Sequence, residues 1–155
     1  MRPSSERHHL WSFVGHADTP HRRQMLTVAK KLKGGLTYIV GQGNAPLSSD
    51  EYRQLLLNSQ VTLVPASSTH PETSRLAEAL EAGSIPIIVR DSYYQGLWGN
   101  HPLPTVDAQW EELPALLSSL DLSYKQRQCV RWWRAQKHTL RAQMLNLIDD
   151  KRSGP

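Results

Sequence analysis

Residues 60–90, QVTLVPASSTHPETSRLAEALEAGSIPIIVR, decide the fold of this chain. The runs Val61–Val64 and Ile85–Val89 are short, apolar and rich in β-branched residues, which is typical of strands buried on both faces of a sheet. Between them, leucines and alanines recur at spacings of three and four, which predicts a helix over about residues 70–82, and Gly83 stands where a left-handed C-cap is expected. A crossover of this length predicts two parallel strands joined in a right-handed βαβ unit.

The start of this helix is expected to lie at a ligand-binding edge. Thr69 and Glu72 fit a capping box, and Pro71 falls in the first turn, where its missing N–H would have had no partner in the helix. Ligands of open α/β sheets bind outside the carboxyl ends of the strands, which places the loop 66–69 and the first helical turns at such a position. The free N–H groups and the positive end of the helix dipole favour an anion such as a phosphate there.

Three charged residues follow on the same helix. Glu72, Arg75 and Glu78 are three positions apart, which keeps them on one side of the helix. An arginine fork binds a diphosphate, and a carboxylate accepts two hydrogen bonds from vicinal hydroxyls, so the pattern favours a nucleotide sugar. Two alternatives stay open: Glu72 as only half of a capping box, and Arg75 with Glu78 as a solvent-exposed pair at i,i+3.

The same residues resemble a known family. The pattern Arg75-x-x-Glu78-Ala79, followed by Gly83-x-Ile85-Pro86, looks like the donor-binding region of the exostosin-type glycosyltransferases and of the related ribitol xylosyltransferases. The resemblance covers about residues 11–120. It implies a Rossmann-like three-layer α/β domain with a mostly parallel sheet, the C-terminal nucleotide-sugar-binding half of a GT-B fold. The nucleotide-sugar-binding residues expected on this helix are Glu72, Thr73, Ser74, Arg75 and Glu78.

The resemblance also implies an activity. Such enzymes transfer a sugar from a nucleoside-diphosphate sugar to a hydroxyl of a glycan or glycoprotein acceptor, and members of the family typically sit in the Golgi membrane. His70 stands where related retaining enzymes carry an acidic residue, so an inverting enzyme is expected. The chain has no Asp-x-Asp motif, and we expect no obligatory metal or cofactor. Catalysis is expected to need an N-terminal GT-B lobe that this chain lacks, and the catalytic base is not identified.

A second part of the same edge is predicted near the N-terminus. Residues 10–14 read as a short apolar strand that ends at Gly15. Thr19 and Pro20 fit the start of a helix that continues to Gly34. Because the loop follows a parallel strand, Gly15 and the start of this helix are expected at the same carboxyl edge as the first site.

Three residues of this second part are candidates for lining the donor phosphates. The family pattern has a strand ending in glycine followed by a basic helix at this place, which implies such a role for Gly15, Arg22 and Arg23. Arg22 is favoured over Arg23, because the helical period turns Arg23 elsewhere. The alternative is a tight turn followed by a solvent-exposed basic face.

The remaining chain continues the alternation of strands and helices. Residues 36–40 and 103–106 predict strands, and residues 48–51 predict another capping box. The segment 91–100 is aromatic and rich in glycine, and we expect a loop that touches a base or sugar or else packs as a lid. Asp107 is expected to cap the helix that follows.

A long amphipathic helix is predicted at the C-terminus. Ser123 is expected to cap it, and apolar residues then recur at spacings of three and four while basic residues occupy the other side. We expect the apolar stripe to dock on the domain or on a partner lobe. Trp132 and Trp133 lie beside arginines, but no nucleic-acid-binding signature accompanies them, so nucleic acid is not expected as a partner.

The length and composition of the chain limit the number of domains and the classes of ligand that it suits. A chain of 155 residues suits one domain with a substantial core. The net charge of +4 favours phosphorylated ligands, and the lone Cys129 excludes an internal disulfide. We expect a flexible N-terminus over 1–9, a donor-binding domain over 10–120, a packed helix over 121–150 and a tail over 151–155. No apolar run is long enough to span a bilayer. A non-catalytic α/β nucleotide-binding or protein-interaction module that has lost turnover is the alternative function.

Overall fold

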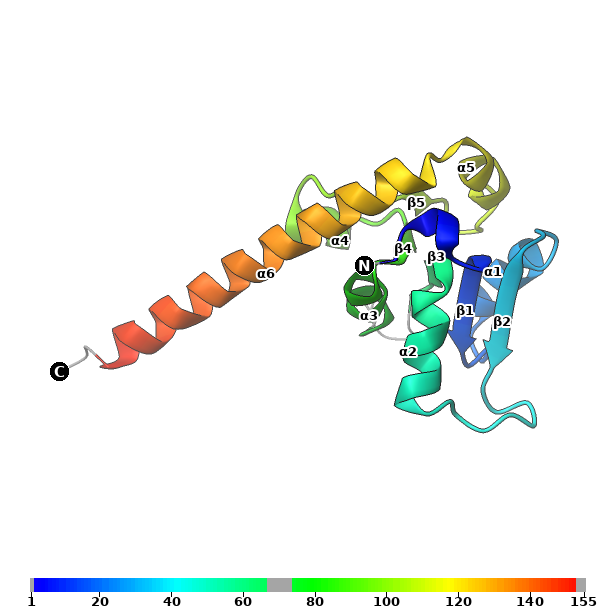
Figure 1. Ribbon diagram of the computed structural model, residues 1–155, viewed down its shortest axis with the longest axis horizontal. Coiled ribbons are helices and arrows are strands. Elements are labelled where there is room, and N and C mark those ends of the chain that lie inside the picture. The colour runs from blue at the N-terminus through cyan, green and yellow to red at the C-terminus, as the bar shows by residue number, and fades with distance from the viewer. Residues whose placement is uncertain (1, 67–73, 153–155) are drawn as a thin grey trace.

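The computed structural model describes residues 2–66 and 74–152, which form a five-stranded parallel sheet with helices on both faces (Figure 1). The strand order is β2-β1-β3-β4-β5. All four neighbouring pairs are parallel. The prediction of a Rossmann-like α/β domain with a long C-terminal helix is confirmed. The strands are β1 (His9–Gly15), β2 (Gly35–Ile39), β3 (Ser59–Val64), β4 (Ile85–Val89) and β5 (Thr105–Val106).

The helices cover the sheet as this strand order requires. Right-handed crossovers place α1 on one face of the sheet and α2 and α3 on the other. In the structure α2 packs against α3, and α5, which follows the last strand, packs against α1. Phe13, Leu63 and Ile87 are fully buried in the core between the layers. The helices are α1 (Pro20–Ala29), α2 (Ser49–Leu57), α3 (Ser74–Ala82), α4 (Ser92–Trp98), α5 (Leu113–Ser119) and α6 (Leu122–Arg152), with a short 3-10 helix η1 (Ser4–Glu6) before β1.

Local sequence signals account for several helix ends. The side chain of Thr19 accepts a hydrogen bond of 3.3 Å from a backbone N–H in the first turn of α1. Ser48 and Glu51 form the predicted capping box at the start of α2. Gly83 follows α3 with a φ of +69°, as a left-handed C-cap requires. The cap predicted for α3 at residues 69–72 lies outside the described residues.

The segment 91–100 was predicted as a loop, and this prediction is wrong. The structure has the helix α4 here, with Asp91 accepting a hydrogen bond of 2.7 Å from the N–H of Tyr93 at its start. Tyr94 is buried and its ring stacks on Trp98 at 5.5 Å between centroids. The burial of these aromatic rings outweighs the roughly 1 kcal/mol by which a glycine in mid-helix is less favourable than alanine.

Two further helix boundaries differ from the prediction. α1 ends at Ala29 and does not continue to Gly34, because a tight turn with a hydrogen bond from Leu32 N to Ala29 O follows it. Asp107 caps a turn and not a helix: its carboxylate accepts hydrogen bonds from the N–H groups of Gln109 and Glu112, and α5 begins only at residue 113.

The N-terminal residues 1–9 were expected to be flexible, but the described part of this segment is packed. Arg7 is buried, and its guanidinium donates to the carbonyl oxygens of Leu56, Ser59 and Ala82 at 2.8–3.1 Å. Ser4 in η1 is buried as well and bonds to Gln126 of α6. Arg7 thereby bonds to carbonyl groups of three segments far apart in the sequence, which no local pattern indicates.

The C-terminal helix α6 packs on the domain over its first half only. Gln126 and Cys129 are buried, whereas Leu140 and Leu147 are 51% and 63% exposed. Figure 1 shows the second half projecting away from the sheet. The expected docking of the apolar stripe therefore holds for about half of the helix. Its N-cap is Asp121, not Ser123, because the Asp121 carboxylate accepts a hydrogen bond of 2.8 Å from the N–H of Tyr124.

Candidate functional site

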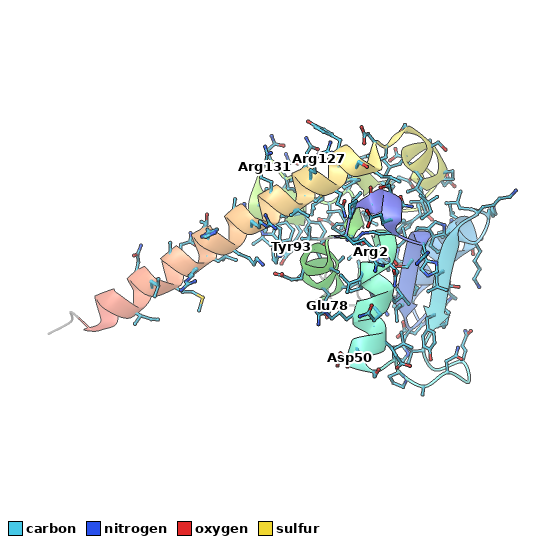
Figure 2. All side chains as sticks on the ribbon, in the orientation of Figure 1. Arg2, Asp50, Glu78, Tyr93, Arg127 and Arg131 are labelled. Carbon is cyan, nitrogen blue, oxygen red and sulfur yellow. The ribbon has the colours of Figure 1, made fainter. Side chains whose placement is uncertain are left out.

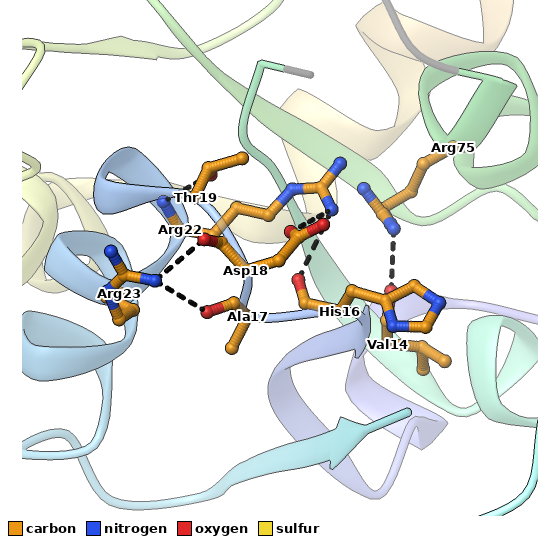
Figure 3. A network of polar contacts seen from close by, with 8 residues as sticks. All are labelled: Val14, His16, Ala17, Asp18, Thr19, Arg22, Arg23 and Arg75. Carbon is orange, nitrogen blue, oxygen red and sulfur yellow. Dashed lines mark hydrogen bonds and ion pairs between the residues drawn. The ribbon is translucent and has the colours of Figure 1, made fainter. Parts of the chain in front are cut away.

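The candidate site lies at the carboxyl ends of β1 and β3. These neighbouring strands are followed by connections that leave in opposite directions, β1 through α1 toward β2 and β3 through α3 toward β4. A crevice outside the strand ends at such a reversal of strand order is where open α/β sheets bind ligands. Two of the predicted residues, Arg22 of α1 and Arg75 of α3, come from these connections and lie near each other (Figure 3). A third, Gly15, is the last residue of β1 and lies against Arg75.

Arg75 crosses from α3 to the end of β1. Its Nη2 donates a hydrogen bond of 2.7 Å to the carbonyl oxygen of Val14, and its guanidinium carbon lies 5.0 Å from the centroid of the Phe13 ring. Nε and Nη1 of the same guanidinium are buried and have no hydrogen-bond partner among the described residues. One nitrogen therefore anchors the fork and Tyr52 also interacts with the guanidinium, while Nε and Nη1 keep hydrogen-bonding capacity for another acceptor.

Gly15 makes room for this arginine. A Cβ atom at this position would lie 2.6 Å from Nη2 of Arg75, closer than real Cβ atoms approach any heavy atom. The φ of Gly15 is +148°, a backbone conformation that favours glycine. The glycine that the sequence suggested as a tight turn thus has a second effect, since it lets a cation lie directly over the end of the strand.

Arg22 of α1 is the second cation of the site. Its Nη1 donates to the carbonyl oxygen of His16 at 3.3 Å and to the carboxylate of Asp18 at 3.2 Å. The side chain of Arg22 is 13% exposed while that of Asp18 is 67% exposed. Nε of Arg22 is also buried without a partner among the described residues. Arg23, in contrast, is exposed and donates to the carbonyl oxygens of Ala17 and Asp18 (Figure 3).

The two arginines are close enough to affect each other electrostatically. Burial lowers the pKa of the Arg75 guanidinium, and the nearby charge of Arg22 lowers it further, whereas Tyr52 and Glu78 oppose this shift. Arginine stays protonated at neutral pH even so. Two partly desolvated cations with unpaired nitrogens lie at one strand edge, and such an arrangement favours an anion between or beside them.

Glu78 lies one turn further along α3 and is held by Tyr52 of α2. The Tyr52 hydroxyl donates a hydrogen bond to Oε2 of Glu78, with 2.8 Å between the two oxygens. Burial raises the pKa of Tyr52, and the bond to Glu78 raises it further. An ion pair between Arg75 and Glu78 is not among those that the described residues form. The contact between Tyr52 and Glu78 was not predicted, because no local sequence pattern indicates that α2 and α3 lie side by side.

Of the three remaining predicted site residues, one lies in the described part of the chain. Ser74 is exposed at the first described position of α3. Glu72 and Thr73 lie outside the described residues, so their predicted roles stay predictions. Within the ranges 2–66 and 74–152, no three His, Cys, Asp or Glu side chains gather as a metal ion would require.

The fold and the site define an α/β domain of the Rossmann-like class, with two neighbouring arginines at its point of strand-order reversal. Comparison with family models is more specific: the model described as RXYLT1 C-terminal domain matches residues 2–152. The chain therefore belongs to the RXYLT1 C-terminal domain family, and the resemblance to the C-terminal lobe of the ribitol xylosyltransferases is confirmed. No significant match was found among curated proteins. None of the described helices is long and apolar enough to cross a membrane.

Proposed function

We propose that this domain binds the nucleoside-diphosphate sugar donor of an inverting glycosyltransferase. The observation that carries the proposal is Arg75, which lies over the end of β1 and has two buried guanidinium nitrogens without a hydrogen-bond partner in the described part of the chain. A diphosphate supplies several charged acceptors for such a fork, and charge-assisted hydrogen bonds are about twice as strong as neutral ones. Arg22 adds a second positive charge next to it. Membership of a glycosyltransferase family supports the same assignment.

Glu78 is proposed to bind the ribose. Tyr52 occupies Oε2 of its carboxylate, and this bond holds the carboxylate in place on the side of α3 that also carries Arg75. A carboxylate fixed in this way accepts hydrogen bonds from the two vicinal ribose hydroxyls through its remaining lone pairs. Diphosphate and ribose are then bound by neighbouring turns of one helix.

The proposed reaction is a single displacement. A hydroxyl of a glycan or glycoprotein acceptor attacks the anomeric carbon, the bond from that carbon to the diphosphate breaks with inversion, and the nucleoside diphosphate leaves. Arg75 and Arg22 stabilise the negative charge that develops on the leaving group, so the proposal includes no obligatory metal ion or cofactor. The base that takes the acceptor proton and the other half of the cleft are proposed to belong to an N-terminal GT-B lobe. The proposed compartment is the Golgi, which the family resemblance implies.

The proposal is tested by calorimetric titration of UDP, GDP, uridine and guanosine into the wild-type chain and two variants. Arg75→Ala is expected to weaken binding of the preferred nucleoside diphosphate by about 10- to 100-fold, the equivalent of roughly 1.5–3 kcal/mol for a hydrogen bond to a charged group, and to spare the nucleoside. Glu78→Ala is expected to weaken both ligands, because the ribose is common to them. Adding a chelator is expected to change none of these affinities.

The matched control is Arg23→Ala, which removes the same charge from the neighbouring position of Arg22, where the side chain is exposed and bonded only to carbonyl groups. It is expected to leave binding within about twofold. Circular dichroism shows whether each variant is folded. A folded wild-type chain that binds none of the four ligands contradicts the proposal for this domain. If Arg75→Ala and Arg23→Ala weaken nucleotide binding equally, the ligand is attracted by the general positive charge of the domain and not bound by a specific contact with Arg75.

A further inference from the structure

A groove lies apart from the candidate donor site and shares no lining residue with it. It is formed between the first half of α6 and the segment 100–102, which leads into the amino end of β5. Its volume is about 660 Å³, within the range of roughly 300–1,000 Å³ that small-molecule sites occupy. Neither the fold prediction nor the donor-site proposal makes use of this groove. Its lining includes the aromatic and cationic residues His101, Tyr124, Lys125, Arg127, Arg131 and Trp132.

The groove is cationic and its charges are not neutralised. Lys125, Arg127 and Arg131 line it, and no Asp or Glu is among its described lining residues. None of these three cations takes part in the ion pairs found in the described part of the chain. Among the described residues, Lys125 donates to the carbonyl oxygen of Pro102, at 3.3 Å. Arg127 and Arg131 are one helical turn apart and are labelled in Figure 2. Three like charges around one hollow repel one another, and a bound anion relieves that repulsion.

The walls of the groove are aromatic and held in place. The Trp132 ring lies edge-on to Trp98 at 5.3 Å between centroids and also contacts His101 at 6.4 Å. The Tyr124 hydroxyl accepts a hydrogen bond of 2.9 Å from the amide of Gln128, one turn along α6. A rigid aromatic wall beside cations offers an apolar surface to the face of a ring while the charge is bound next to it.

Polar groups in the wall have hydrogen-bonding capacity to spare. Nδ1 of His101 and Oε1 of Gln128 are buried and have no partner among the described residues. Burial lowers the pKa of His101, which favours its neutral imidazole at neutral pH. A neutral imidazole and an amide offer both donors and acceptors, which suits hydroxyl groups after small side-chain rotations. The groove therefore combines sites for an anion, for hydroxyls and for an apolar ring face.

We propose that this groove binds an anionic carbohydrate, with its phosphate or carboxylate on Arg127 and Arg131 and its ring against Trp132. The shared chemistry is a negatively charged group on a polyhydroxylated ring, which both a sugar phosphate and a uronic acid possess. The groove is lined by α6 and by the segment 100–102, and neither Arg75 nor Gly15 is among its lining residues, so the ligand is separate from the donor. This inference rests on the groove alone and does not depend on nucleotide-sugar binding.

The test is an NMR chemical-shift titration of the full chain with glucose 6-phosphate, glucuronic acid, glucose and inorganic phosphate. At least one of the two anionic sugars is expected to bind tenfold or more tightly than glucose and than inorganic phosphate, with shifts centred on α6 residues 124–132. The two anionic sugars distinguish a phosphorylated from a uronic acid ligand. The double variant Arg127→Gln/Arg131→Gln is expected to weaken binding at least tenfold.

The matched control is Arg134→Gln/Arg141→Gln, which removes two arginines from the same helix but outside the groove. It is expected to change the affinity less than twofold, and Arg75→Ala is expected to leave it unchanged. The proposal is overturned if glucose binds as well as the charged sugars, if no anionic sugar binds, or if both double variants act equally. It is also overturned if a six-nucleotide single-stranded RNA binds more tightly at the same residues, which would assign the groove to nucleic acid.

Discussion

At the scale of single residues, the candidate donor site depends on the contact between Gly15 and Arg75. In Gly15→Ala, the added Cβ would lie 2.6 Å from Nη2 of Arg75, so the guanidinium must leave the carbonyl oxygen of Val14. We expect the variant to fold with a loss of about 1 kcal/mol in the free energy of unfolding and to bind nucleoside diphosphate at least tenfold more weakly than the wild type. Urea unfolding and calorimetric titration measure the two effects.

Gly43→Ala is the control for backbone strain. Gly43 also has a positive φ, +80°, but an added Cβ there meets nothing within 4 Å. Gly43→Ala should therefore cost backbone strain alone, whereas Gly15→Ala should also displace Arg75 and should be the one of the two that weakens binding. If Gly15→Ala binds nucleoside diphosphate as well as the wild type does, the position of Arg75 over β1 is not required for the ligand.

At the scale of elements, α6 is expected to have two halves of different stability. Its first half is tied down by a hydrogen bond of 2.9 Å from Gln126 to the carbonyl oxygen of Gly83 and by one of 2.8 Å from the Trp133 ring to Glu81. Leu140 and Leu147 in the second half are exposed. Amide hydrogen exchange, normalised to the unfolded chain, is expected to be at least tenfold slower over residues 126–133 than over residues 140–148.

The comparison is made at low and high protein concentration to separate folding from association. Equal protection of both halves at low concentration would contradict the division of α6 that the structure shows. Protection of residues 140–148 that appears only at high concentration would indicate that copies of the chain cover the exposed apolar side chains.

At the scale of the whole molecule, Arg7 links the N-terminal segment to three other elements. Its guanidinium donates to the carbonyl oxygens of Leu56, Ser59 and Ala82, and burial lowers its pKa to about 10, so it is still charged at neutral pH. Arg7→Met keeps much of the apolar stem but leaves these buried carbonyl groups without their donor. We expect the free energy of unfolding to fall by about 3 kcal/mol, measured by urea denaturation.

Arg23→Met serves as the control, because Arg23 also donates to two carbonyl oxygens but at an exposed position where water replaces it. It is expected to change the free energy of unfolding by less than about 0.5 kcal/mol. A small effect of Arg7→Met would mean that residues 2–9 contribute little to stability, as the sequence alone had led us to expect.

The sequence by itself determined the class of fold and the identity of the main candidate residues. The apolar runs that form β3 and β4, the helix between them and Gly83 as its C-cap are local patterns, and local patterns survive in the folded chain because each agrees with the packing around it. The βαβ unit then implied the binding edge, and with it Arg75 and Gly15, since ligands of parallel sheets bind at carboxyl strand ends.

Tertiary structure alone decided which side chains meet. Tyr52 reaches Glu78 only because α2 and α3 lie on the same face of the sheet, and Arg7 finds its carbonyl partners only at a sheet edge formed by segments far apart in the chain. The helix α4 forms because the burial of Tyr94 outweighs local glycine preference. Such contacts depend on long-range packing, and their free energies exceed the few tenths of a kcal/mol that local spacing rules describe.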